Sequence, residues 1–355
     1  MAEIVPNFDS SKIYKIIISE DTPNFETLCN ALKNSSAKFE LDLSNTNVAT
    51  LEKGAIHDLS KMTALELPSG LTTMKAGAIY SNSNLTSIEI PATVTTIEGN
   101  PFVYANYESS TVRCYDSSKL TSISIATGNS SYVVDDGILY SSDKTELVYY
   151  PSNKTASTFA IPGTVTTIGE AAFAGNTKLT QVNFNAGLTT IGDYAFAKLS
   201  NNKTVIIPAS VTSIGKCSFY ANYKLETLTI TGGNSYTIGN YAFSYFGIKA
   251  QGATKNCKVT IGEGVESLSQ SAFQMSYFDT SENDPLVLPA SLNVLDRFNF
   301  DRGEVKFIKS LATTPPEVGN SSLYSTGIQK IFVPSGSVEA YKSADGWKEY
   351  TIIGF

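Results

Sequence analysis

A phrase of thirteen residues recurs along this 355-residue chain, and the repeat constrains the fold more than any other feature. The clearest copy, Ile-Pro-Gly-Thr-Val-Thr-Thr-Ile-Gly-Glu-Ala-Ala-Phe, ends at Phe173, and each of the next two copies ends 23 residues further on, at Phe196 and Phe219. One such unit cannot bury its apolar side alone, whereas stacked units share a continuous core, so the repeat predicts a solenoid. Looser copies end at Ile56, Ile79, Phe102, Phe243, Phe273 and Phe300.

A strand signal lies ahead of the phrase in each repeat. The segment Leu225–Ile230 is typical: apolar and polar residues alternate over six positions, which indicates a strand with one buried face. A proline then ends the strand at the same level in successive repeats, because it has no N–H to donate to a ladder. These prolines are Pro68, Pro91, Pro162, Pro208 and Pro289.

The rest of the phrase predicts how each coil closes. A short apolar pair is followed by a glycine, which we expect where the backbone turns tightly or approaches the neighbouring coil. The Ala-Phe pair then closes the coil on a turn or a short helical segment, with the Phe ring at its centre. Strands of successive coils would pair side by side in one parallel sheet, above stacked Phe rings. The recurring glycines are Gly169, Gly192, Gly215 and Gly239.

Composition and charge argue against several functions. The net charge is −7 and no basic run could follow a phosphate backbone, so we expect no nucleic-acid partner. The single histidine, His57, is expected in a surface turn and gives no basis for a catalytic triad or a His-based zinc site. We predict no catalytic residue, no cofactor, no metal site and no transmembrane segment. The four cysteines have no CxxC spacing and are expected to be buried thiols.

The phrase L-x-x-I-x-I-P-x-x-V-T-x-I-G-x-x-A-F resembles the BspA-type, or Treponema pallidum-type, leucine-rich repeat. The likeness extends over about residues 41–309 and is clearest at Leu85–Ile97 and Ile161–Ile230. It implies an α/β leucine-rich repeat solenoid that is mostly strand with short helical turns. Such a solenoid is curved, carries its parallel sheet on the concave face and is capped at both ends.

Three segments are predicted on this basis. Residues 1–40 would form an N-terminal cap of a strand and a short helix, residues 41–310 the solenoid, and residues 311–355 a C-terminal cap. A β-hairpin variant unit is expected at about residues 126–160, because Asp136-Gly137 is a turn signal between alternating runs. In the caps, Thr22-Pro23 predicts a helix start with a cap residue and a first-turn proline. Ser337 is expected to cap a short C-terminal helix, and Trp347 to anchor that cap.

The outward side chains of the strands form two predicted columns on the concave face. Acidic residues lie early in the chain, small hydroxyl residues in the middle and basic residues late, and Lys306 is assigned to the second column. Outward apolar residues such as Ile206 are the kind of anchor that interfaces use. The partner-binding candidates are Glu66, Glu89, Gln181, Asn183, Ile206, Thr229, Lys258, Val287, Lys330 and Phe332.

One loop contains residues that raise the question of a calcium site. Asp279, Glu282 and Asp284 could together hold a calcium ion, but they lack the spaced oxygens and the glycine of an EF-hand loop. We therefore expect a solvated loop.

These observations favour a non-catalytic protein-interaction module, and the resemblance implies a bacterial cell-surface or secreted, adhesin-like protein that binds host or microbial surface proteins. A glycan partner stays open. The alternatives are a carbohydrate-binding or carbohydrate-active repeat protein, and a structural spacer in a larger surface protein. The first four residues lack the features of a secretory signal. The chain is thus either cytoplasmic or exported by a signal that is not in this sequence, and the resemblance favours export.

Overall fold

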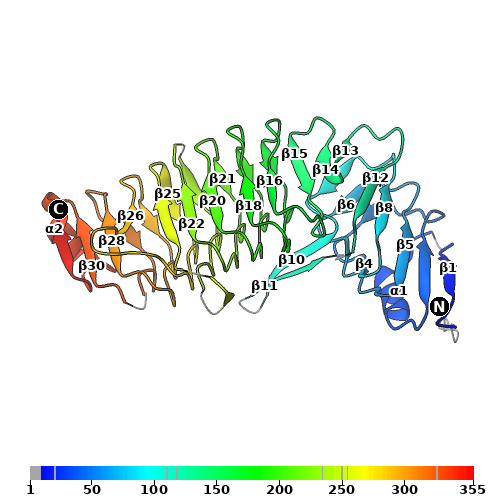
Figure 1. Ribbon diagram of the computed structural model, residues 1–355, viewed down its shortest axis with the longest axis horizontal. Helices are drawn as coiled ribbons and strands as arrows, with labels where there is room; N and C mark the ends of the chain where they lie inside the picture. Colours follow the sequence, from blue (N-terminus) through cyan, green and yellow to red (C-terminus); the bar gives the residue numbers. More distant parts are fainter. Residues whose placement is uncertain are drawn as a thin grey trace. The chain divides into compact units, whose positions relative to one another are not determined.

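The chain forms two compact units, and its short strands are arranged in coils (Figure 1). The first contains residues 1–155 with 168–176, and the second contains residues 156–167 with 177–355. This division concerns compactness, and it does not coincide with the predicted segment boundaries at 40 and 310, which concern repeat type. The predicted N-terminal cap includes residues 1–8, which lie outside the described part. The computed structural model describes residues 9–19, 21–108, 111–116, 119–233, 235–248, 251–253, 255–324 and 327–355.

The first unit is built from short strands and one helix. Most strands pair in parallel with the equivalent strand of another coil, in the orders β1-β2-β5, β8-β12, β3-β6-β9 and β4-β7. The elements are β1 (Ile13–Ile17), α1 (Phe25–Leu32), β2 (Lys38–Asp42), β3 (Thr50–Leu51), β4 (Ile56–His57), β5 (Met62–Glu66), β6 (Thr73–Lys75), β7 (Ile79–Tyr80), β8 (Ser87–Ile90), β9 (Thr96–Glu98), β10 (Val103–Glu108), β11 (Thr111–Asp116), β12 (Ser122–Ile125), β13 (Tyr132–Asp135), β14 (Ile138–Ser141) and β15 (Glu146–Tyr149).

Two antiparallel insertions interrupt the coils of the first unit. Strands β13 and β14 pair around Asp136-Gly137, as the turn signal predicts, and β15 pairs with β14. The second insertion, the antiparallel pair β10-β11, was missed by the sequence analysis, although Val103–Glu108 has the alternation of a half-buried strand. Figure 1 shows this pair as a long projecting arm.

The second unit has two strands in most coils. The first strands pair in parallel in the orders β16-β18-β20-β22-β24 and β26-β28-β30-β31, and the second strands in the order β19-β21-β23-β25-β27-β29. The elements are β16 (Thr158–Ala160), β18 (Gln181–Asn183), β19 (Thr190–Ile191), β20 (Thr204–Ile207), β21 (Ser213–Ile214), β22 (Thr227–Ile230), β23 (Tyr236–Ile238), β24 (Lys258–Ile261), β25 (Val265–Leu268), β26 (Leu286–Leu288), β27 (Val294–Leu295), β28 (Phe307–Ser310), β29 (Glu317–Val318), β30 (Lys330–Val333), η2 (Ser335–Ser337), α2 (Val338–Ser343) and β31 (Ile352–Gly354); β17 (Thr167–Ile168) lies where the units divide.

The parallel solenoid is confirmed, with two differences. The prediction of one sheet is wrong, because a coil supplies strands to more than one ladder: Leu228 and Ile238 are buried from two strands of one coil. The helical content is also lower than an α/β description implies. The coil closures at the Ala-Phe pairs are turns. Hydrogen bonds between the backbones of neighbouring coils already satisfy the N–H and C=O groups of these residues without a helix.

Stacked aromatic rings form the centre of the second unit. Phe196, Phe219 and Phe243 are at most 1% exposed, and their rings stack in sequence with centroids 5.1 and 5.0 Å apart and interplanar angles of 11° and 8°. Phe273 and Phe300 continue the stack at 5.5 and 6.1 Å. Each ring is thus a neighbour of the ring in the next coil, as the repeat predicts.

The turns around these rings have an unusual backbone. The residues two before and two after Phe196 and Phe219, such as Tyr194 and Lys198, have positive φ although they are not glycine. This conformation costs an L-residue about 1–2 kcal/mol. It directs the N–H groups of Tyr194, Phe196 and Lys198 to carbonyls of the next coil at 2.7–2.8 Å. Inter-coil hydrogen bonds therefore offset the backbone strain.

The terminal segments differ in detail from their predicted forms. Asn24, not Thr22, is the N-cap of α1, because its Oδ1 accepts the N–H of Thr27 at 2.9 Å. Ser337 does occupy the N-cap of α2, but its hydroxyl donates to the carbonyl of Thr313. Trp347 is fully buried, and its Nε1 donates to the carbonyl of Pro316 at 2.8 Å. That these segments act as caps stays a prediction.

Two of the recurring glycines lie where the backbone of one coil touches that of the next. A Cβ at Gly239 would lie 2.7 Å from both the carbonyl carbon of Gly215 and the carbonyl oxygen of Ile214. A Cβ at Gly215 would lie 2.5 Å from Oδ1 of Asp193. Neither glycine has positive φ, so close approach between coils, rather than turn geometry, requires them.

We expect Phe219→Ala to lower the free energy of unfolding by about 3–5 kcal/mol, because it removes a buried ring from the middle of the stack. Tyr324→Ala is the control, since this ring is 71% exposed and its loss should cost under about 0.5 kcal/mol. Urea unfolding followed by circular dichroism gives both values. Equal effects of the two substitutions would contradict a core role for the stack.

Gly239→Ala should destabilise the chain by about 1–3 kcal/mol, because the added methyl group has only backbone to displace. A Cβ at Gly163 would have no atom within 4 Å, and φ is not positive there, so Gly163→Ala should be neutral or stabilising by up to about 1 kcal/mol. Thermal unfolding of the two variants compares them directly. If both variants were destabilised, or both stabilised, contact between coils would not explain the effect of Gly239→Ala.

Candidate functional site

The outward side chains of the first strands form what we call the open face of each unit. Strand register aligns these side chains in columns, since parallel pairing places Asp42 beside Glu66 in the first unit and Ile206 beside Thr229 in the second. The interleaved side chains, such as Leu65 and Val205, are buried. The predicted alternation is confirmed at these strands, whereas curvature was an expectation from the family resemblance alone.

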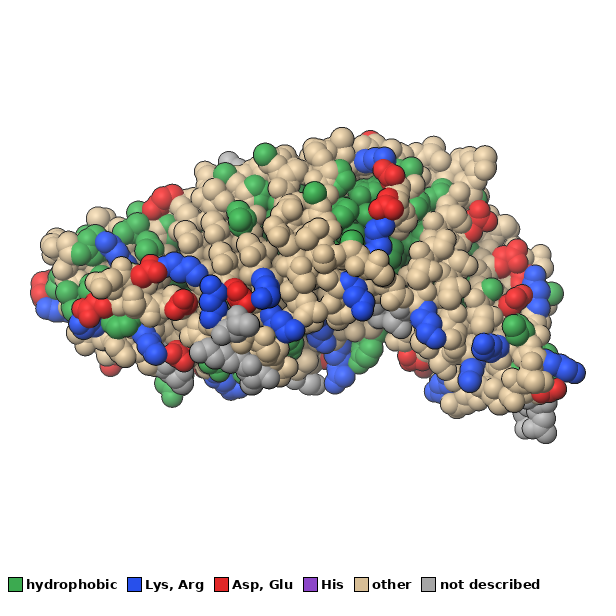
Figure 2. Space-filling view, viewed as in Figure 1, with side chains coloured by type: hydrophobic (Ala, Val, Ile, Leu, Met, Phe, Trp, Pro, Cys, Tyr) green, Lys and Arg blue, Asp and Glu red, His purple; other side chains and the backbone are tan. Residues whose placement is uncertain are grey.

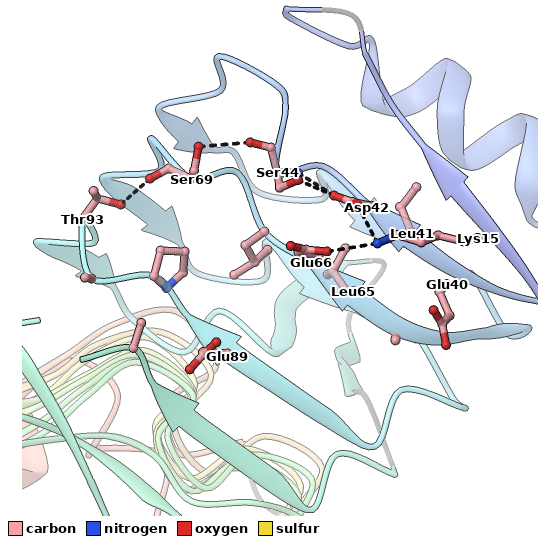
Figure 3. Close-up of a pocket in the computed structure, with 15 residues that line it drawn as sticks. Lys15, Glu40, Leu41, Asp42, Ser44, Leu65, Glu66, Ser69, Glu89 and Thr93 are labelled. Carbon is pink, nitrogen blue, oxygen red and sulfur yellow. Dashed lines mark hydrogen bonds and ion pairs between the residues drawn. The ribbon is translucent and has the colours of Figure 1, made fainter. Parts of the chain in front are cut away.

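In the first unit the open face contains a pocket of about 500 Å³ (Figure 3). Four carboxylates line it, from Glu40, Asp42, Glu66 and Glu89, together with the ammonium group of Lys15. We call these five residues the acidic pocket. Strands β1, β2, β5 and β8 each supply at least one of them, because alternate positions of each strand face outward. Lys15 and Glu40 share one column, and Asp42 and Glu66 share the next.

Lys15 organises one side of the acidic pocket. Its Nζ lies 2.9 Å from Oδ2 of Asp42 and 3.5 Å from Oε2 of Glu66 (Figure 3). Asp42 is only 6% exposed and also accepts two hydrogen bonds from Ser44, from the hydroxyl at 2.6 Å and the backbone N–H at 2.9 Å. The Ser44 hydrogen bonds, and then Lys15, lower the pKa of Asp42 to about 2. The carboxylate is therefore held ionised.

Only part of this pocket was predicted from the sequence. Glu66 and Glu89 were predicted and lie in it, while Lys15, Glu40 and Asp42 were missed. Lys15 and Glu40 were assigned to the N-terminal cap, and Asp42 to the start of the solenoid. The signal was present, because the alternation in Lys38–Asp42 places Glu40 and Asp42 on the same side as Ala64 and Glu66.

In the second unit, three predicted residues meet at a smaller pocket. Gln181, Asn183 and Ile206 line a hollow of about 200 Å³, with Phe184 and Thr204 in its wall. The amide of Gln181 donates to Oδ1 of Asn183 at 2.7 Å, and the Ile206 side chain is 55% exposed. Thr229 lies beside Ile206 in the next strand. The structure therefore brings these four predicted residues into one neutral patch.

The two predicted lysines are ion-paired to the loop that was considered for calcium. Lys258 pairs with Asp284, and Nζ of Lys330 lies 2.6 Å from Oε1 of Glu282. The loop is exposed to solvent, as predicted, and its carboxylates reach back to lysines of β24 and β30. Since Glu282 and Asp284 are engaged in these ion pairs, the loop gives no support to a calcium site.

Val287 and Phe332 lie in one column but with a different neighbour from the predicted one. Register pairs Val287 with Lys309 and Lys309 with Phe332, whereas Lys306 precedes β28. The assignment of Lys306 to this column was wrong, because the repeat is irregular there and the strand begins later. Phe332 and Val287 are half-buried.

A second surface feature is a cluster of aromatic rings. The ring of His57 stacks on Tyr80 at 5.2 Å, and Tyr80 lies 4.9 Å from Tyr104 and 6.1 Å from Tyr115 of the β10-β11 arm. His57 is therefore half-buried at the end of β4 rather than in a surface turn, because register pairs it with Tyr80. Cys114 also differs from prediction: it is half-buried on this arm, while the other three cysteines are buried.

The described residues contain no group of three or more His, Cys, Asp or Glu side chains placed to hold a metal ion. Among the same residues no helix has the length and apolar character needed to cross a membrane. The open faces carry polar and charged side chains together with isolated apolar ones.

Comparison with known proteins identifies the repeat. The family model for the BspA-type leucine-rich repeat region matches residues 7–108 and 148–278 in six copies. The crystal structure of the pneumococcal vaccine antigen PcpA is similar, with 21% identity, 90% of this chain and 68% of that chain covered, and a TM-score of 0.56. A leucine-rich repeat protein from Eubacterium ventriosum has 23% identity, 77% and 72% coverage, and a TM-score of 0.57. A search of curated protein sequences gave no match.

The Asp42 carboxylate should make stability depend on pH. Its folded pKa of about 2 lies below the ordinary value of 3.8, so its contribution is full above about pH 4 and is lost as pH falls through 2. We expect wild type to be more stable than Asp42→Asn at pH 6 and this gap to shrink by pH 2.5. Urea unfolding at both pH values measures it. A gap that does not change with pH would contradict the assignment, and the exposed Glu98, replaced by Gln, is the control.

Proposed function

Because this chain belongs to the BspA-type leucine-rich repeat family, we propose that it is a non-catalytic module that binds a protein partner through its open face. The observation that carries this proposal is the neutral patch of the second unit, where Ile206 stands 55% exposed among Gln181, Asn183 and Thr229. An apolar anchor among uncharged hydrogen-bonding groups is typical of the centre of a protein interface.

The general character of the surface supports the same role. Figure 2 shows that uncharged polar side chains and backbone cover most of the face in view, with acidic and basic side chains interspersed toward both ends of the chain. Only 17% of the residues are charged. Removing water from such a surface costs less free energy than removing it from a charged one, so it suits contact with a folded partner.

We further propose that the protein is an adhesin-like protein at the surface of a bacterium or secreted from it, and that its partners are host extracellular or microbial surface proteins. The family membership and the similarity in fold to a pneumococcal vaccine antigen support this proposal.

A carbohydrate-active enzyme is the less favoured alternative. Glycosidases need paired carboxyl groups, one of which is held protonated by a raised pKa. In the acidic pocket the shift goes the other way, since the pKa of Asp42 is lowered. Incubation with a panel of polysaccharides tests this alternative, and new reducing ends would contradict the non-catalytic proposal.

We expect Ile206→Asp to reduce capture of a protein partner from extracellular matrix extracts or bacterial surface extracts by about tenfold or more, because a carboxylate would replace the apolar anchor. Tyr324→Asp is the matched control, since Tyr324 is 71% exposed but lies outside the first strands. Quantitative pull-down with the wild type and both variants measures capture. Equal capture by all three would exclude the neutral patch as the binding site.

A further inference from the structure

The acidic pocket of the first unit carries a charge imbalance that its own residues do not correct. The four carboxylates and single ammonium group of the acidic pocket give a formal net charge of −3. Lys15 is committed to Asp42 and Glu66. Within the described chain, the side chains of Glu40 and Glu89 have no ion pair, and both are exposed. A bound cation would complement this face.

The size and spread of the pocket point to an organic cation rather than a metal ion. Its carboxylates come from three different strands, and they form no cluster that could hold a metal among the described residues. The volume of about 500 Å³ is far larger than one ion needs, and it falls within the usual range for ligand pockets. Ala64, Pro91 and Ala126 in the lining keep it open and supply apolar contact for an alkyl chain.

The edge strand β1 adds an apolar component. Ile13 and Ile17 flank Lys15 at alternate positions, so all three side chains lie on the same side of the strand. Ile13 is 60% exposed and Ile17 is 55% exposed, which is uncommon for isoleucine on a strand. Register places Ile17 beside Asp42 of the acidic pocket and Ile13 beside Lys38, so Ile17 is the exposed isoleucine next to the acidic hollow (Figure 3 shows the hollow).

We propose that the acidic pocket binds an arginine or lysine side chain of a partner protein, in an extended segment that crosses the strands so that an apolar side chain two positions away contacts Ile17. Alternate residues of an extended segment face the same side, so the recognised pattern is a basic and an apolar residue separated by one position. A guanidinium group is favoured, because its planar donors match carboxylates in pairs. This inference rests on the proposed protein-binding function and names the chemistry of one partner segment.

Fluorescence anisotropy with the full chain tests the proposal directly. The probes are two labelled peptides, Leu-Ser-Arg-Ser-Leu and Leu-Ser-Glu-Ser-Leu, at low salt. The arginine peptide should bind at least about tenfold more tightly than the glutamate peptide, and its binding should weaken as sodium chloride is raised. Equal affinity for both peptides, or no binding of the arginine peptide at millimolar concentration, overturns the proposal.

Substitutions localise the site. Glu89→Gln and Glu40→Gln should each weaken the arginine peptide by about fivefold, because each removes one unpaired carboxylate at nearly constant shape. Glu98→Gln is the control, since it removes an exposed strand carboxylate outside the pocket and should have no effect. If Glu98→Gln weakened the binding of the arginine peptide equally, the attraction would come from the overall negative charge, and the proposed site would be wrong. Binding of calcium chloride that requires Glu89, without peptide binding, would assign the pocket to a metal instead.

The two functional tests fail independently. Ile206 lies in the second unit, so partner capture that depends on Ile206 while the arginine peptide does not bind overturns only the acidic-pocket proposal. If peptide binding depends on Glu89 while Ile206→Asp does not affect partner capture, only the proposal for the neutral patch is contradicted.

Discussion

Contact between equivalent residues of successive coils is the constraint on which the structure depends. In the second unit the ring of Phe219 stacks on that of Phe196 at 5.1 Å, and the N–H of Phe196 donates to the carbonyl of Ser218 in the turn of the next coil. Any change in coil length must therefore be absorbed away from the ring. Irregular repeats do this with loops: the 30-residue step from Phe243 to Phe273 still keeps their rings stacked at 5.5 Å.

This constraint also creates the surfaces that can bind. Ladders between parallel strands place the outward residues of neighbouring coils side by side, so a functional patch is assembled from positions one repeat apart. Asp42 and Glu66 meet in this way, as do Ile206 and Thr229. The backbone cannot separate two carboxylates that share a column, so electrostatic repulsion must be relieved by another group. In the first unit Lys15 supplies that relief for two of the four carboxylates of the acidic pocket.

The open faces of the two units differ in whether their charged side chains form ion pairs within the chain. The acidic pocket leaves Glu40 and Glu89 without an ion pair in the described chain, whereas Lys258 and Lys330 are neutralised by carboxylates of the chain's own loop. Charge that is already paired internally gives little attraction to a partner. This is why the neutral patch and the acidic pocket, rather than the late lysines, are the better binding candidates.

The sequence by itself determined the repeat, the outward and inward alternation of the strands, the buried phenylalanines and the close-approach glycines, because each depends only on spacing along the chain. Only the tertiary structure decided which side chains of different strands and loops contact one another. It brought Lys15 to Asp42 and Glu66, shifted the late column from Lys306 to Lys309, and returned Glu282 to Lys330 over 48 residues. These contacts depend on irregular repeat lengths and on a flanking strand that carries no repeat signal. They also depend on strand register and on the reach of each side chain, which are defined only when the coils are stacked.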